Sequence, residues 1–75
     1  MKNKNTSLQL REEYINAFQK YSHVLTQNQY QIFHLYYIED LSLSEIANIL
    51  ATTRANVYDT LTKARNNLKP FLSIQ

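Results

Sequence analysis

The clearest pattern of hydrophobic and polar positions is centred on residues 41–58, where one apolar stripe with helical spacing ends and a second begins. The first stripe consists of Leu43, Ile46, Ala47 and Leu50. The periodicity breaks at residues 51–53, and Thr53 is a residue type that caps helix N-termini. The second stripe consists of Val57, Leu61, Ala64 and Leu68. Two helices joined by so short a turn must cross steeply, so the pattern predicts a helix-turn-helix whose second helix offers its outer face to a major groove.

Capping signals divide the rest of the chain into helices. Thr6, Thr26 and Ser42 each stand three residues before a Gln or Glu, which is the spacing of a capping box. Pro70 lies where the last helical pattern should stop. The predicted elements are a disordered segment 1–5, helices at about 7–24, 27–38, 43–50 and 54–69, and a tail 70–75.

The first two predicted helices differ in their apolar surface. The first is amphipathic, and its stripe consists of Leu10, Tyr14, Ala17, Phe18, Tyr21 and Leu25. The second carries apolar or aromatic residues on most of its circumference, which is typical of a central helix. Asp40 follows the second helix, and Asp tolerates the left-handed backbone of a sharp turn better than most residues.

Composition narrows the class of protein. The chain has 75 residues, of which 44% are hydrophobic and 12% aromatic, enough for one small helical core. The absence of glycine excludes phosphate-cradling loops and dinucleotide fingerprints, and the absence of cysteine excludes disulfides and thiolate metal sites. The sequence contains neither an apolar run of the roughly 18 residues that a membrane span needs nor an apolar secretory segment. We therefore expect a single all-α, cytoplasmic domain that makes no membrane contact.

The sequence contains no recognisable pattern of catalytic residues. His23 and His34 are the only imidazoles, and neither has a second ligand at metal-binding spacing. No serine or threonine has a recognisable His and Asp partnership. We expect no catalytic residue, no metal, no cofactor and no small-molecule substrate, so the chain is not predicted to be an enzyme.

The charge of the chain is uneven along its length. The formal net charge is +2. Residues 53–69 carry four basic residues and one acidic residue, whereas residues 26–50 carry three acidic residues and no Lys or Arg. Basic charge therefore gathers in the helix that would face nucleic acid.

The outward face of the last predicted helix supplies the candidate binding residues. The full set is Arg54, Asn56, Tyr58, Asp59, Thr62, Lys63, Arg65 and Lys69. By their chemistry Arg54 could read guanine, Asn56 adenine and Asp59 the N4 group of cytosine. Lys63, Arg65 and Lys69 would hold phosphates. Because Asp59 repels phosphate and the phosphate contacts are few, a monomer would bind double-stranded DNA weakly, and useful affinity would need a dimer or a second partner.

Three runs of residues resemble the YlxM family of small bacterial helix-turn-helix proteins, which are similar to region 4 of sigma factors. These runs are LTQNQY at 25–30, LYYIEDLSLSEIA at 35–47 and NVYD at 56–59, and the resemblance covers residues 25–69. It implies a four-helix, sigma-region-4-like domain of the winged-helix type without a wing. It also implies a role in transcription regulation by DNA binding and a link to the signal recognition particle pathway. The family usually continues into a longer, charged C-terminal helix and has a shorter first helix, so the resemblance does not extend to contacts made by that C-terminal helix.

Three hypotheses about function remain open at this point. The first is a DNA-binding regulatory module, which the basic last helix and its polar outer face favour. The second is an accessory protein that binds the GTPase or RNA of the signal recognition particle and not DNA, which Asp59 and the low net charge favour. The third is a protein–protein adaptor or homodimer, whose contact stripe would be formed by Leu10, Tyr14, Phe18 and Tyr21.

Overall fold

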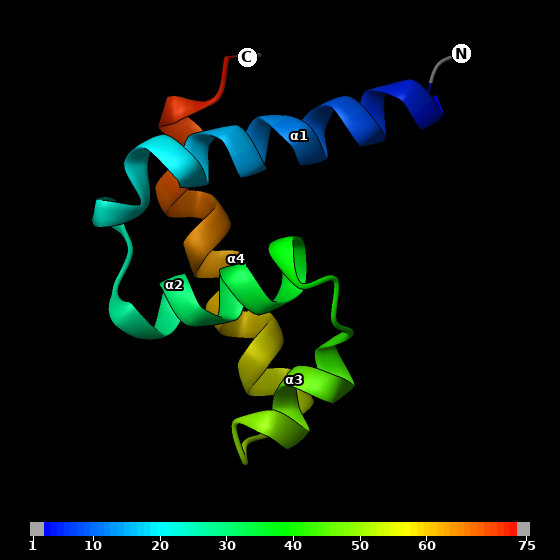
Figure 1. Cartoon of the computed structure of the whole chain (residues 1–75), viewed down its shortest axis with the longest axis vertical. Coiled ribbons are helices and arrows are strands. Elements are labelled where there is room, and N and C mark those ends of the chain that lie inside the picture. The colour runs from blue at the N-terminus through cyan, green and yellow to red at the C-terminus, as the bar shows by residue number, and fades with distance from the viewer. Residues whose placement is uncertain (1–2, 74–75) are drawn as a thin grey trace.

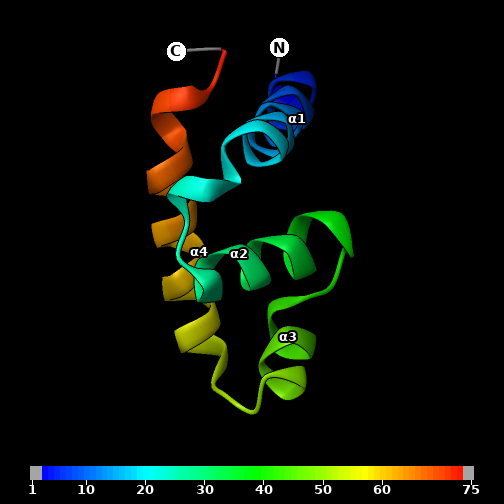
Figure 2. The ribbon, with the colours of Figure 1, turned by 60° about the vertical axis from the view of Figure 1, so that its left-hand side comes forward.

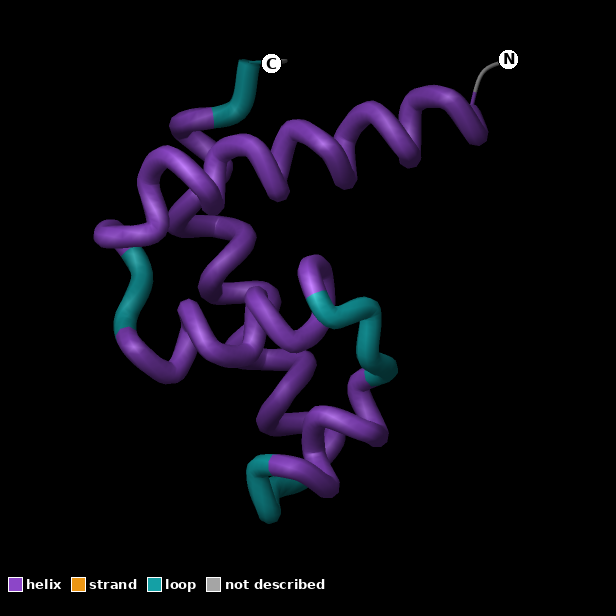
Figure 3. Tube along the Cα trace, in the orientation of Figure 1, coloured by secondary structure: helices purple, strands orange, loops and turns teal. Residues whose placement is uncertain are grey.

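The computed structural model describes residues 3–73 of the 75-residue chain, with side chains from Leu8 onward. These residues form four α-helices and no strand: α1 (Asn3–Tyr21), α2 (Gln27–Phe33), α3 (Leu43–Ile49) and α4 (Arg54–Leu68) (Figure 1). Short 3₁₀ turns at Ser22–Val24 and Lys69–Phe71 follow α1 and α4, and a π-helical segment, His34–Ile38, extends α2. Figure 3 colours all the helical segments alike and shows the loops between them. The predicted all-α, four-helix class is confirmed.

The start of α1 differs from the prediction. The helix begins at Asn3, so residues 3–5 are helical and Thr6 lies inside the helix, where it does not act as the N-cap. Residues 1–2 of the predicted disordered segment lie outside the described residues. The polar residues before Thr6 have helix propensities within about 0.7 kcal/mol of alanine, so no strong signal ends the helix at Thr6. At the other end α1 stops at Tyr21, and the 3₁₀ turn carries the chain to Val24.

The N-terminal caps of the three later helices are those predicted. Thr26 and Gln29 exchange hydrogen bonds of 3.1 and 3.2 Å between side chain and backbone, and Ser42 and Glu45 do the same at 3.1 and 2.8 Å. Thr53 Oγ1 accepts a 3.0 Å bond from the backbone N–H three residues later. Each cap satisfies N–H groups that the first turn of a helix leaves unpaired, which explains why α2, α3 and α4 begin where they do.

Two residues in the turns have left-handed backbone geometry. Asp40, with φ of 64°, was expected to tolerate it, whereas Ala51, with φ of 55°, occupies a position that glycine usually fills. At the end of α3, Thr52 N–H donates to the carbonyl of Ala47 at 2.9 Å, which is the bond that closes a Schellman motif. Ala51 therefore lets the chain reverse between α3 and α4 at the expense of steric strain at its Cβ.

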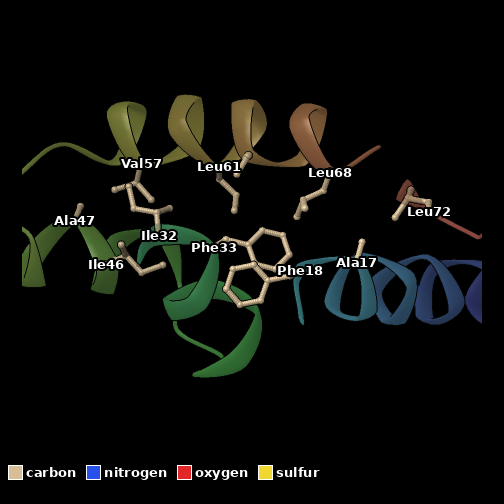
Figure 4. Close-up of a cluster of buried hydrophobic side chains, with 11 residues drawn as sticks. Ala17, Phe18, Ile32, Phe33, Ile46, Ala47, Val57, Leu61, Leu68 and Leu72 are labelled. Carbon is tan, nitrogen blue, oxygen red and sulfur yellow. The ribbon is translucent and has the colours of Figure 1, made fainter. Parts of the chain in front are cut away.

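The core is organised around α4, which contacts each of the other three helices (Figure 2). The predicted stripe of Val57, Leu61, Ala64 and Leu68 is buried, with Thr60 beside it. Figure 4 shows Val57, Leu61 and Leu68 of this stripe facing the other buried residues, which are Ala17, Phe18, Ile32, Phe33, Ile46, Ala47 and Leu72. The second predicted helix, 27–38, has the expected neighbours on several sides: α2 packs on α4, Phe33 stacks on Phe18 of α1, and the π-helical segment contacts α3. Its fully buried residues are only Ile32 and Phe33.

The residues after α4 fold back onto α1. The rings of Phe71 and Tyr21 stack with centroids 4.4 Å apart, and Leu72 is buried in the core. Ser73 N–H donates to the Glu13 carboxylate at 3.0 Å. These contacts place α1 and the C-terminal turn at one end of the molecule and the α3–α4 turn at the other (Figure 1).

Candidate nucleic-acid interface

The face of α4 opposite its buried stripe is open to solvent along the length of the helix. Six of the eight predicted site residues are exposed: Arg54, Asn56, Tyr58, Asp59, Lys63 and Lys69. The other two, Thr62 and Arg65, are half-buried. The helical period explains this arrangement, because a stripe at every third or fourth position leaves a polar face on the other side.

A shallow, open depression of about 610 Å³ lies between the first turn of α4 and the start of α3. Its lining consists of Leu43, Arg54, Ala55 and Tyr58. The Thr53 cap sets the position of the first turn of α4, and the Ser42 capping box does the same for Leu43 at the start of α3. From the spacing, Leu43 was expected only in the apolar stripe of its helix, because spacing alone does not show that part of its surface stays open.

Two polar residues on the shoulder of α4 have partners within the chain. Asn56 donates its side-chain amide to Thr52 Oγ1 at 2.9 Å, which ties it to the turn before the helix. Lys63 Nζ lies 3.1 Å from Asp59 Oδ2, an ion pair between side chains that are 63% and 64% exposed. The Lys63 charge therefore offsets the Asp59 carboxylate, so that Asp59 repels phosphate less than an isolated carboxylate would, and Lys63 attracts it less.

Arg65, unlike Lys63 and Lys69, is held by aromatic side chains of the π-helical segment. Arg65 Nε donates to the Tyr37 hydroxyl at 2.8 Å, and its guanidinium lies 5.7 Å from the centroid of the Tyr37 ring and 5.9 Å from that of Tyr36. These contacts join α4 to the π-helical segment. Thr62 also has a partner within α4, since its hydroxyl donates to the Tyr58 carbonyl at 2.9 Å.

The stripe considered as a partner surface mostly packs within the chain. Phe18 is only 4% exposed, and its ring stacks on Phe33 with centroids 4.6 Å apart. Tyr14 and Tyr21 are half-buried against the core, whereas Leu10 is 40% exposed. A partner could reach Phe18 only by displacing these contacts.

The phenol of Tyr14 has a raised pKa. Burial raises its pKa above the ordinary value of 10.0, and the negative charge that Tyr37 can carry raises it further. The Arg65 guanidinium opposes both effects. The rings of Tyr14 and Tyr37 lie 6.4 Å apart, so Tyr14 belongs to the cluster that connects α1, the π-helical segment and α4.

Neither a cluster of metal-ligating side chains nor a membrane-spanning helix is found in the described part of the chain. Residues 3–73 contain no group of three or more His, Cys, Asp or Glu side chains that could hold a metal ion. Over the same residues, no helix combines the length and the hydropathy that crossing a bilayer requires.

Two capped helices joined by a tight left-handed turn, the second with a buried stripe and an open polar face, define a helix-turn-helix domain. Comparison with known proteins supports this class. The family model UPF0122, described as "Putative helix-turn-helix protein, YlxM / p13 like", matches residues 8–73. The chain belongs to this family, as its resemblance to YlxM proteins predicted.

Relatives in several bacteria carry the same family name. A UPF0122 protein of Mycoplasma capricolum is 44% identical over 63 residues, which are 84% of this chain and 56% of the relative. A UPF0122 protein of Thermoanaerobacter sp. strain X514 is 45% identical over 51 residues, or 68% of this chain and 44% of the relative. The chain thus spans about half the length of the curated relatives it matches. No solved structure matches the chain.

Proposed function

We propose that this protein is a regulatory protein that binds duplex DNA through the outer face of α4. The observation that carries the proposal is the division of α4 into a fully buried apolar face and an open face with exposed Arg54, Asn56 and Lys63. The start of α4 lies at the end of the molecule away from α1 (Figure 1), so a duplex can approach it without meeting the first helix.

The residues of the open face would divide their roles by position. Arg54 lies in the first turn of α4, the part of a recognition helix that usually reaches base edges, and its guanidinium matches the two acceptors of guanine. Asn56 would contact adenine with the part of its amide that Thr52 does not use. Lys63 and Lys69 would contact phosphates and set the position of the helix along the groove.

The affinity expected from this surface is low. The two phosphate contacts of Lys63 and Lys69 predict a fall in affinity of roughly 12-fold between 50 and 200 mM salt, from a slope of about −0.9 per contact. Weak binding by one copy fits a protein that acts together with a second copy or another attached partner.

The test measures binding to a fluorescent duplex of about 20 base pairs, two helical turns, in about 50 mM salt. Arg54→Ala and Lys63→Ala should weaken binding without lowering the melting temperature, since both side chains are exposed. Lys20→Ala is the matched control, because it removes the same charge from an exposed position on α1 and should leave binding unchanged. Absence of binding by the unaltered chain at this salt concentration would overturn the proposal.

A second candidate function is an accessory role in the signal recognition particle without DNA binding. The Asp59–Lys63 ion pair and the formal net charge of +2 favour it, because both weaken attraction to a polyanion. A tagged chain should then recover the GTPase or RNA of the particle from a bacterial lysate and should not retard DNA. Sedimentation velocity over a range of concentrations would show whether either activity involves a homodimer.

A further inference from the structure

The depression at the start of α4 differs in chemistry from the rest of the open face. Leu43, Ala55 and the ring of Tyr58 make most of its lining apolar, and Arg54 is its one charged lining residue. Tyr58 is 56% exposed, so a large aromatic surface stays in water at the position where a recognition helix meets base edges. A phosphate group makes no favourable contact with the apolar part of this lining. The depression therefore fits an apolar ligand group.

The major groove of DNA presents one apolar group among the four base pairs, the C5 methyl of thymine. Small apolar and aromatic side chains recognise thymine by contact with this methyl group. We propose that Leu43, Ala55 and Tyr58 form a receptor for a thymine methyl group and give the protein a preference for thymine at that position. This inference rests on the proposed binding of duplex DNA and specifies which base the apolar part of the site reads.

The surroundings of the depression support a DNA base as its occupant. Arg54 lines it, and α4, with 15 residues, directs the positive end of its dipole toward the same turn. Both features attract the phosphate backbone and so bring base edges to the apolar lining. The depression is open and shallow, which suits a methyl group that protrudes from the floor of a groove better than a bulky side chain inserted from a protein partner.

The experiment compares two duplexes of alternating A·T sequence and about 20 base pairs, which differ only in carrying thymine or uracil. Uracil lacks the C5 methyl group and keeps the hydrogen-bonding groups of thymine. Because the A·T sequence alternates, a C5 methyl group is available wherever the protein binds along the thymine duplex. Binding to the thymine duplex should be about fourfold tighter, the factor expected when one methyl group leaves water. Alternating G·C duplexes with cytosine or 5-methylcytosine supply a second pair, in which the added methyl group should strengthen binding.

Two variants assign the effect to the depression. Tyr58→Ala should bring the thymine-to-uracil ratio close to one, and its circular dichroism melting curve reports whether the fold is kept. Lys69→Ala should weaken binding to both duplexes by the same factor and leave the ratio unchanged, because it removes a phosphate contact. Equal binding of the thymine and uracil duplexes by the unaltered chain would overturn the inference while the proposed function stands. A ratio that survives Tyr58→Ala would overturn the assignment to this depression, and absence of binding to every duplex would overturn the proposed function and the inference together.

Discussion

The left-handed Ala51 between α3 and α4 provides a sharp test of the turn. Its φ of 55° brings Cβ close to the following carbonyl oxygen, which costs an L-residue about 1–2 kcal/mol. Ala51→Gly removes that strain, while the extra freedom of glycine in the unfolded chain offsets about 0.4–1 kcal/mol of the gain. The expected net increase in the free energy of unfolding is about 0.5–1 kcal/mol, which raises the Tm of a domain of this size by about 2–8 °C.

The assay is thermal and urea unfolding followed by circular dichroism at 222 nm, where α-helices give a strong negative signal. Ala55→Gly is the matched control, because it is the same substitution at an exposed residue in the first turn of α4. There glycine should lower the stability by roughly 0.5 kcal/mol, since the position is helical. An Ala51→Gly variant that is no more stable than the unaltered chain would refute the argument that Ala51 is strained.

Three further predictions concern contacts that hold the helices in place. Thr53→Ala removes the cap of α4 and should lower stability by about 1 kcal/mol, whereas Thr53→Asn should retain most of it, as measured by urea unfolding. A double-mutant cycle of Tyr37→Phe and Arg65→Met should show a coupling energy of about 1 kcal/mol, the contribution of their hydrogen bond; additive effects would count against it. Because the folded-state pKa of Tyr14 lies above its unfolded value, its contribution to stability is complete below about pH 10 and is lost as the pH rises through the folded pKa. Unfolding curves between neutral and strongly alkaline pH should therefore show a smaller alkaline loss in Tyr14→Phe.

The parts of the fold that could be predicted from the sequence rest on local chemistry. A Thr or Ser cap acts on an N–H group three residues away, so Thr26, Ser42 and Thr53 mark the starts of their helices without knowledge of the fold. The buried stripe of α4 follows in the same way from helical periodicity. The left-handed geometry of Asp40 was also foreseeable, because its side chain tolerates that region.

The parts that could not be predicted depend on contacts between distant residues. Arg65 has the charge and spacing of a phosphate contact, but Tyr37 lies 28 residues earlier in the chain, and only the fold brings the two together. The return of the C-terminal turn onto α1 likewise depends on the stacking of Phe71 on Tyr21. The π-helical segment His34–Ile38 was expected as ordinary helix, because π-helical turns are rare.

The candidate site was predictable in outline and not in its finer chemistry. Helical spacing placed Arg54, Tyr58 and Lys63 on the open face, where the structure also has them. The depression needs Leu43 from one helix beside Ala55 from the next, and that proximity depends on the turn at residues 50–53. The sequence alone therefore did not predict an apolar depression within the polar face of α4.

The central claim, that the outer face of α4 binds duplex DNA, is tested most directly by nuclear magnetic resonance. The isotopically labelled chain is titrated with a duplex of about 20 base pairs in about 50 mM salt, and the backbone amide shifts are followed residue by residue. We expect the largest changes at Arg54, Tyr58 and Lys63, with smaller changes at the start of α3 and little change along α1. Shifts that gather on α1, or no shifts at saturating DNA, would contradict the account.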